Sequence, residues 1–496
     1  MSKKFFTVAM LIVLLVALVP GGAHAQEVAC AETYTVQADD WLSKLADRFY
    51  GDIFSYPAIT WKTNQANAAD DSFAKITNSD VIEIGQKLCI PTAEEAQAYF
   101  AAQATIAGAT SGDTVKIGAL APLSAPGSVT GGNAMKAAFE IAVEEINAAG
   151  GVLGRPVELI LVDTEGLPER GTAAMERLIN QDGVVGVVGE YHSAVGLTAK
   201  EVAHDNGIPT IFAETWNQNI TAVQYPEVFR IAPLSPVVSA VDAEFVASLG
   251  FKKVVIMSEN TGYGIPAAAD TEAFLAEKGI EAVSFFADLG TQDFSGIIPR
   301  IKEENPDLIW VLSTGETSYN FEQQAAEAGI GPQDLPMVCN QVAGDSEAYW
   351  SNVPDGNLCF YRRIGLPKEK YTEATTAFEA KYVEKTGKSS AESYAMEAYD
   401  SLKLMAMAIN EAGSTDPNAI ISALEGISYD GVLGTITFPF GTHNPIPEGT
   451  DPMWWHQFPD PAITIVQYTE PGQQSSEAVT VFPATYKTAD PILPGQ

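Results

Sequence analysis

The hydrophobic pattern of the long stretch from about 113 to 485 alternates between two kinds of run. Short, nearly continuous apolar runs predict buried strands, whereas apolar residues three and four positions apart predict amphipathic helices. The predicted strands are 115–120, 157–162, 184–188, 209–212, 253–257, 282–286 and 308–312, and the first predicted helix is 132–149. Alternating strands and helices predict an α/β fold with parallel sheets.

This stretch is longer than one doubly wound sheet usually holds, so we expect two Rossmann-like doubly wound lobes joined by a hinge. We assign about 113–234 and 367–432 to lobe 1, and about 235–366 and 433–485 to lobe 2. Ligands of such sheets bind at the carboxyl ends of the strands. The candidate binding loops are therefore 121–130, 190–194, 213–216, 260–264, 314–317 and 340–341.

A shorter stretch, from about 30 to 91, has a different pattern. Residues 34–36 predict a strand, 41–49 a helix and 81–84 a returning strand. Residues 92–112 begin with a helix-favouring Glu-Ala-Gln pattern and end in Ala-Thr-Ser-Gly, which is typical of a flexible linker. We therefore expect a small module at 30–91 that is separated from the long stretch.

The first 25 residues have the pattern of a secretory signal peptide. Two lysines precede an apolar run at 5–19, and small residues precede the expected cleavage site after Ala25. A lipid anchor on Cys30 is the alternative, but Glu27 occupies the place where a lipidation motif needs an apolar residue. We expect secretion across the cytoplasmic membrane to the cell wall or periplasm, with no direct membrane insertion.

Charge and cysteine content narrow the function. A formal net charge of −35 excludes general affinity for nucleic acid and disfavours binding to anionic lipid. The four cysteines, in an oxidising compartment, predict two disulfides rather than a metal site. The sequence leaves their pairing open, although Cys30 with Cys89 and Cys339 with Cys359 would each link one predicted unit.

A series of positions in the 30–91 stretch follows a known motif. These positions are Tyr34, Val36, Asp40, Leu42, Leu45, Ala46, Phe49, Asn64, Ile82 or Ile84, Gly85, Leu88, Ile90 and Pro91. In this order they resemble a LysM module, which implies a βααβ fold and binding of peptidoglycan. The implied glycan contacts lie in two loops, at Asp39, Asp40, Trp41, Asn78 and Asp80. Asp39 and Trp41 depart from the usual glycine and threonine, so the alternative is that Trp41 is a core aromatic and glycan affinity is lost.

A second series of motifs runs through most of the long stretch. It comprises 116–124, 137–147, 150–151, 154–159, 163, 173–178, 187–189, 193, 207–209, 228–230, 263–264, 293–295, 301–302 and 306–307. In order and spacing, these segments resemble the type I periplasmic binding proteins for branched-chain amino acids. The resemblance implies a protein that closes two lobes over an amino acid, an amide or a small carboxylate. It also implies delivery of that ligand to the membrane permease of an ABC importer.

The resemblance also implies site residues in lobe 1. A serine at the position of Ser193, with nearby backbone amides such as that of Ala194, holds the ligand carboxylate in the amino-acid-binding relatives. The next loop departs from the family, because Glu214 and Trp216 stand where small residues and a threonine are usual. Glu214 would pair with a ligand cation and Trp216 would stack on the ligand. The alternative is that Glu214 faces solvent and Trp216 packs in the hinge.

Lobe 2 supplies the remaining implied contacts. Tyr263 stands where relatives place a tyrosine over the ligand. Asn340 replaces an acidic residue that commonly neutralises an α-ammonium group, and Glu316 would compensate from the adjacent loop. Further candidates, from strand-end loops and from the helix that resumes lobe 1, are Thr314, Gln341 and Tyr394.

Motifs for catalysis are missing from the sequence, which has no Gly-x-Ser-x-Gly, no His-Glu-x-x-His and no Cys–His pairing. His443 and His456 have no carboxylate or cysteine at ligand spacing, so we expect a loop that packs aromatics there rather than a metal site. We expect no enzyme activity, no cofactor and a monomeric chain. Two alternatives to transport remain: a ligand-sensing receptor of the same fold, and a wall-associated binding protein.

Overall fold

The computed structural model describes residues 28–38, 40, 42–50, 56–76, 82–96, 99, 114–342 and 349–495. Internal contacts divide the chain into two compact units, with the boundary between Ser111 and Gly112. This boundary falls at the end of the expected linker. The expected signal peptide and most of the linker lie outside the described residues.

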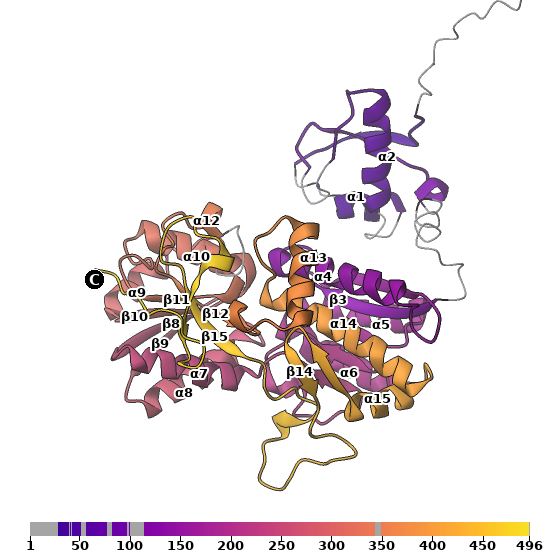
Figure 1. Ribbon diagram of the computed structural model, residues 1–496. Coiled ribbons are helices and arrows are strands. Elements are labelled where there is room, and N and C mark those ends of the chain that lie inside the picture. Colours follow the sequence, from indigo (N-terminus) through magenta and orange to yellow (C-terminus); the bar gives the residue numbers. More distant parts are fainter. Residues whose placement is uncertain are drawn as a thin grey trace, which may run out of the picture. The chain divides into compact units, whose positions relative to one another are not determined.

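The first unit, drawn in indigo in Figure 1, encloses a small hydrophobic core between two helices and a pair of antiparallel strands. Its elements are β1 (Glu32–Thr35), α1 (Leu42–Tyr50), α2 (Tyr56–Ala69) and β2 (Lys87–Ile90). This order confirms the predicted βααβ fold. A disulfide between Cys30 and Cys89 ties the chain before β1 to the middle of β2.

The prediction of a returning strand at 81–84 was wrong. Ile84 is 73% exposed, and it lies in a turn with Gly85, whose φ is +90°. The returning strand is β2, in which Leu88 and Ile90 alternate into the core. The apolar run at 81–84 matched a strand in local composition, but pairing with β1 selected the segment after the turn.

Lobe 1 of the second unit contains a five-stranded parallel sheet with the strand order β4-β3-β5-β6-β7. Its strands are β3 (Val115–Ala121), β4 (Val157–Asp163), β5 (Val187–Gly189), β6 (Thr210–Phe212) and β7 (Val228–Arg230). The helices between them are α4 (Val129–Ala148), α5 (Pro168–Arg177) and α6 (Ser193–Asn206). After β3 the chain adds β4 on one side of it and then adds β5 on the other side. This reversal of direction is what the predicted doubly wound fold requires.

Lobe 2 contains a seven-stranded sheet with the order β16-β15-β12-β11-β10-β8-β9. The strands are β8 (Lys253–Glu259), β9 (Glu281–Ala287), β10 (Leu308–Leu312), β11 (Met337–Cys339), β12 (Phe360–Ile364), β15 (Ile463–Gln467) and β16 (Val479–Phe482). The helices are α7 (Ser235–Ser248), α8 (Gly264–Glu277), α9 (Ile298–Glu304), α10 (Gly315–Glu327) and α12 (Tyr349–Asn352). β15 and β16 extend the parallel part of the sheet in antiparallel fashion, and a disulfide joins Cys339 to Cys359.

The chain crosses between the lobes after β7, after β12 and before β15. Between the last two crossings it returns to lobe 1 as α13 (Glu373–Thr386), α14 (Ser393–Ala412), α15 (Pro417–Gly426), β13 (Ser428–Gly431) and β14 (Gly434–Thr437). We expected lobe 2 to resume near 433, but it resumes at β15. The intervening segment stays on lobe 1 because Phe438 and His456 pack on Phe229, with ring centroids 5.0 and 3.9 Å away.

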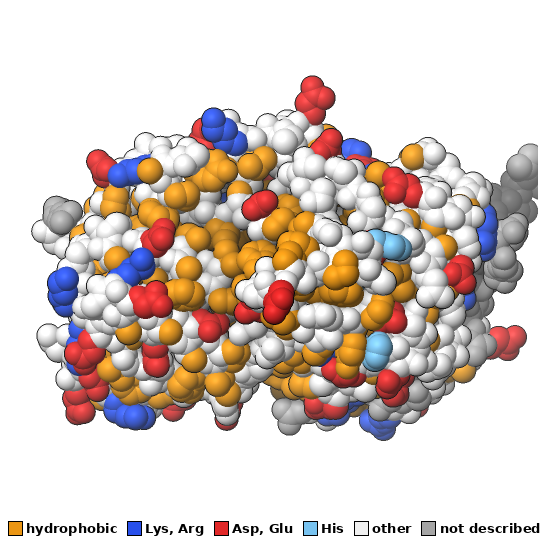
Figure 2. All heavy atoms as spheres, turned by 90° about the horizontal axis from the view of Figure 1, so that it is seen from below, with side chains coloured by type: hydrophobic (Ala, Val, Ile, Leu, Met, Phe, Trp, Pro, Cys, Tyr) orange, Lys and Arg blue, Asp and Glu red, His pale blue; other side chains and the backbone are white. Residues whose placement is uncertain are grey.

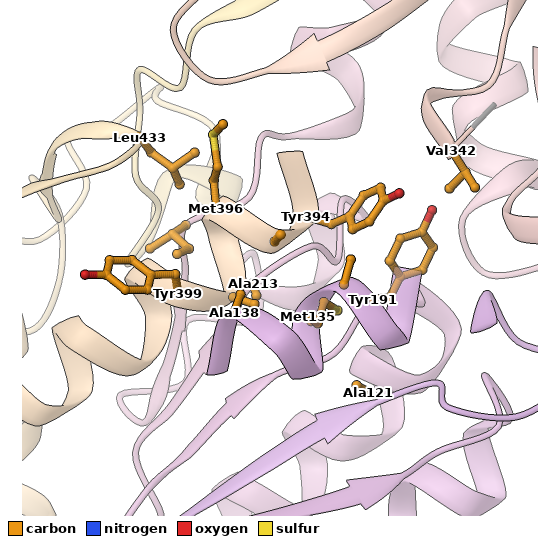
Figure 3. Close-up of a cluster of buried hydrophobic side chains, with 14 of the residues drawn as sticks. Ala121, Met135, Ala138, Tyr191, Ala213, Val342, Tyr394, Met396, Tyr399 and Leu433 are labelled. Carbon is orange, nitrogen blue, oxygen red and sulfur yellow. The ribbon is translucent and has the colours of Figure 1, made fainter. Parts of the chain in front are cut away.

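The helix pair α4 and α14 forms a large part of the lobe 1 core. Figure 3 shows Met135 and Ala138 of α4 beside the helix that carries Tyr394 and Tyr399. Both helices have 20 residues, and their buried faces meet each other. Within the described ranges, no helix is both long and apolar enough to cross a membrane.

Candidate functional site

A cavity lies between the two lobes. Lobe 1 lines it with Gly166, Tyr191, His192, Ser193, Ala194, Glu214 and Trp216, and lobe 2 with Glu259, Thr261, Tyr263, Leu289, Thr314, Asn340, Gln341 and Arg362. Nearly all of these residues lie at the carboxyl end of a strand or just after it, because parallel strands of both sheets point toward the cavity. On the face shown in Figure 2, hydrophobic side chains gather in the middle, where the lobes meet.

Most of the predicted ligand contacts line this cavity. They are Ser193, Ala194, Glu214, Trp216, Tyr263, Thr314, Asn340 and Gln341. Tyr394 lies one layer behind the lining, because its ring meets Tyr191 edge-on with centroids 5.7 Å apart (Figure 3). Glu316 also stands outside the lining, where it contacts the start of α4.

Ser193 begins α6, and its hydroxyl organises the loop after β6. Its Oγ accepts hydrogen bonds from the backbone amides of Trp216 and Asn217, at 3.0 and 3.1 Å. These bonds use the oxygen lone pairs and leave the hydroxyl hydrogen to donate. Ser193 therefore shapes the cavity wall and keeps one donor for a bound solute.

The two unusual residues of lobe 1 are buried at the boundary between the lobes. Glu214 is 5% exposed, so it does not face solvent, and its Oε1 accepts a hydrogen bond of 3.3 Å from Gln341 in lobe 2. The ring of Trp216 meets Tyr263 edge-on at 6.0 Å. The guanidinium carbon of Arg362 lies 5.7 Å from the centre of the Trp216 ring. Trp216 thus both lines the cavity and packs between the lobes.

The sequence analysis missed two charged residues of the cavity lining, Glu259 and Arg362. Glu259, the last residue of β8, accepts hydrogen bonds from Thr261 Oγ1 and from the amide and hydroxyl of Thr314, at 2.7, 2.7 and 2.8 Å. Arg362, within β12, forms a buried ion pair with Asp242 of α7. Burial lowers the pKa of Arg362, but the Asp242 carboxylate raises it further, so the guanidinium stays charged. The sequence signal that could have identified them is a charged residue inside an apolar run. Such a residue is buried only when it is paired, so it indicates a specific partner.

Tyr191 and His192 were also missed, although both lie in a predicted binding loop. Burial lowers the pKa of His192 to about 3, so its ring is neutral. Its Nε2 accepts a hydrogen bond of 2.9 Å from the backbone amide of Ser128 at the start of α4. His192 therefore joins the loop after β5 to the loop after β3.

The lobes touch directly around the cavity. Asn217 Nδ2 of lobe 1 donates to the carbonyl oxygen of Gly262 in lobe 2 at 2.6 Å. On another side, the Glu316 carboxylate of α10 accepts hydrogen bonds from the amides of Val129 and Thr130, at 3.2 and 2.9 Å, and from the Thr130 hydroxyl at 2.8 Å. Hydrogen bonds therefore join the two lobes beside the cavity.

Only one predicted glycan contact of the first unit falls within the described residues. Asp40 Oδ2 accepts hydrogen bonds from the Tyr34 hydroxyl, at 2.7 Å, and from the Gln37 amide, at 2.8 Å, so it holds the loop after β1. The other four, Asp39, Trp41, Asn78 and Asp80, lie outside the described residues.

The two histidines near the end of the chain contact one carboxylate. Glu425 binds both His443 and His456, and its distance to His456 Nε2 is 2.8 Å. His456 stacks on Phe229, and the indole nitrogen of the neighbouring Trp455 donates to the Tyr225 carbonyl oxygen at 3.1 Å. In the part of the chain that the structure describes, no three histidine, cysteine or acidic side chains are grouped to hold a metal ion. The segment packs its aromatics on lobe 1, whereas we expected a loop that packs aromatics between the lobe and the tail.

Comparisons with known proteins agree with this architecture. Residues 114–454 match the family described as periplasmic binding protein, and residues 34–91 match the LysM domain. The chain therefore belongs to the periplasmic binding protein family, whose branched-chain amino-acid-type members are solute-binding proteins rather than enzymes. A LysM domain precedes that part of the chain.

Individual relatives have low sequence identity to this chain, but the similarity covers most of its length. A Leu/Ile/Val-binding protein homolog of Brucella melitensis is 27% identical over 68% of this chain and 90% of its own length. A leucine-, isoleucine-, valine-, threonine- and alanine-binding protein of Pseudomonas aeruginosa is 26% identical over 66% and 86%. Two solved structures share the fold. A leucine-binding protein of Thermotoga maritima has a TM-score of 0.63 and 23% identity, covering 74% of this chain and 97% of its own. A benzoate complex from R. palustris has a TM-score of 0.64 and 19% identity, covering 77% and 99%.

Proposed function

We propose that this chain is the extracytoplasmic solute-binding protein of an ABC importer. Its solute is a small polar molecule, held in the cavity between the lobes. The observation that carries the proposal is a cavity walled by polar side chains from both lobes, at the carboxyl ends of both sheets. Relatives over most of this length are named for the amino acids they bind, which supports a small polar solute here.

Binding and closure are coupled in this proposal. A solute that touches Ser193 from lobe 1 and Tyr263 from lobe 2 gains its full set of contacts only when the lobes are together. It therefore shifts an open population toward the closed one. The closed form then presents a surface to the membrane permease, which distinguishes loaded from empty protein.

The test of this site combines identification and affinity. Mass spectrometry of solute that copurifies with the protein, followed by calorimetry against an amino-acid and aromatic-acid panel, names the ligand. Ser193→Ala and Tyr263→Ala should each weaken its binding by about 1–3 kcal/mol. Glu303→Gln, at an exposed position on α9, is the control and should change nothing. Unchanged affinity in both pocket variants would reject this cavity as the binding site.

The LysM domain supports a second part of the proposal, in which the protein is exported and held at peptidoglycan. Residues 1–25 serve as the signal peptide, and the domain then keeps the binding protein in the cell wall or periplasm without a lipid anchor. The test is sedimentation with purified peptidoglycan, comparing residues 26–496 with the same chain lacking 26–112. If both stay in the supernatant, the tether is rejected while solute binding is unaffected.

A further inference from the structure

The charged groups around the cavity favour one kind of solute. Among the described residues, the lining contains the carboxylates of Glu214 and Glu259 and the guanidinium of Arg362. Arg362 is paired with Asp242, and both side chains are 1% exposed, so the positive charge is already balanced. His192 is neutral, and burial raises the pKa of Tyr263, which stays protonated. Burial raises the pKa of Glu259, but hydrogen bonds from Thr261 and Thr314 act in the opposite direction and favour its carboxylate. With Glu214, the wall of the cavity therefore carries more negative than positive charge.

Gln341 adds a neutral hydrogen-bond acceptor beside these carboxylates. Its Nε2 donates to Glu214, and since a carboxylate only accepts, the amide must be oriented with its Oε1 away from Glu214. Gln341 is 3% exposed, and among the described residues its Oε1 has no hydrogen-bond partner. A buried amide oxygen without a hydrogen-bond partner raises the free energy of the protein. An N–H or O–H donor on the solute would therefore bind favourably to this atom.

Aromatic side chains complete the surroundings of this acceptor. Trp216 and Tyr263 approach from opposite lobes with their rings nearly perpendicular, at 87°. Aromatic faces attract cations, most strongly where water is excluded. The buried indole N–H of Trp216 has no partner among the described residues, so it would suit an oxygen elsewhere on the solute.

Given the proposed function, in which this cavity holds the transported solute, we propose that the solute is a small organic cation. Its N–H groups donate to Gln341 Oε1 and to the Glu214 carboxylate, and Trp216 and Tyr263 flank it. Primary amines and amidines have the required donors and charge. A simple carboxylate has neither. A zwitterion brings the donors, but its carboxylate is repelled by the excess negative charge of the wall.

The first experiment varies only the charge of the probe. Calorimetry at low salt compares 3-methylbutylamine, leucine and 4-methylpentanoate, and likewise benzylamine, phenylglycine and phenylacetate, on protein freed of copurified solute. We expect the amine of each series to bind most tightly, at least tenfold more tightly than the carboxylate. If leucine, phenylglycine or either carboxylate binds most tightly, the cation inference is overturned while solute binding stands.

If no probe binds, the net charge of the copurified solute decides, and a neutral or anionic solute overturns the inference. A chain that binds no probe, retains no solute and shows unchanged solution scattering with the whole panel would reject the proposed function itself. The two failures are therefore distinguishable.

The second experiment removes the charge that the inference depends on. Glu214→Gln keeps the size of the side chain and one acceptor oxygen but removes the negative charge. It should therefore weaken amine binding tenfold or more and leave carboxylate binding unchanged or stronger. Glu303→Gln is the matched control on the exposed surface of lobe 2. Equal amine affinity in wild type and Glu214→Gln would contradict the inference.

Discussion

Glu316 connects the lobes without touching the cavity, which makes it a direct probe of closure. From α10 in lobe 2 its carboxylate accepts two backbone N–H groups and one hydroxyl at the start of α4 in lobe 1. The groups that it binds include amide donors that a helix cannot satisfy within its first turn. Because the two helices belong to different lobes, these bonds exist only while the lobes are closed.

The size of the effect follows from the type of contact. A carboxylate at a helix N-terminus stabilises by about 0.3–1 kcal/mol when exposed and up to about 2 kcal/mol when partly buried. Glu316 is partly buried, and the amide oxygen of Glu316→Gln still accepts one weaker bond, so we take a loss of about 1 kcal/mol. That loss lowers the ratio of closed to open protein by about fivefold.

Small-angle scattering of the ligand-free protein measures this ratio. Glu316→Gln should give a larger radius of gyration than wild type, and solute binding should weaken by up to about fivefold because the competent population falls. The control is Glu327→Gln at an exposed position on the same helix. Identical scattering and identical affinity in Glu316→Gln and wild type would refute the argument, as would an equal effect of the control.

Three further predictions concern stability. Arg230 is buried and donates to four neutral oxygens, so Arg230→Met should lower the free energy of unfolding by about 3 kcal/mol in urea titration; a loss below about 1 kcal/mol would contradict it. Replacing both Cys30 and Cys89 by serine opens a link spanning 59 residues, so the LysM transition in calorimetry should lose about 4 kcal/mol; an unchanged transition would argue against this. Burial raises the pKa of Glu425, but hydrogen bonds from His456 and nearby amides lower it to about 2, below the unfolded value. Its contribution of about 3 kcal/mol is therefore present above pH 4.5 and lost as the pH falls toward 2, and a Glu425→Gln variant with the same acid sensitivity as wild type would disprove this.

Much of the candidate site was predictable because strand ends are local features. Ser193, Glu214 and Tyr263 each follow an apolar run that forms a parallel strand, so their positions on the cavity follow from chain order. Arg362 was not predictable in this way, because it lies within β12 and reaches the cavity through its place in the sheet. Glu316 was predicted to contact the ligand because it follows β10 closely in the chain. The structure instead places its carboxylate against the start of α4 in lobe 1, so it does not line the cavity.

The sequence by itself determined the alternation of strands and helices, the two-lobed α/β class and most of the loops that line the cavity, although the predicted loop 121–130 does not line it. These features depend on hydrophobic periodicity and chain order, which are properties of neighbouring residues. Only the tertiary structure decided that Arg362 is neutralised by Asp242 and that lobe 2 resumes at β15. The pairing of charges, and which lobe a segment packs on, depend on distances between segments that are far apart in the chain. The local hydrophobic pattern therefore does not predict them.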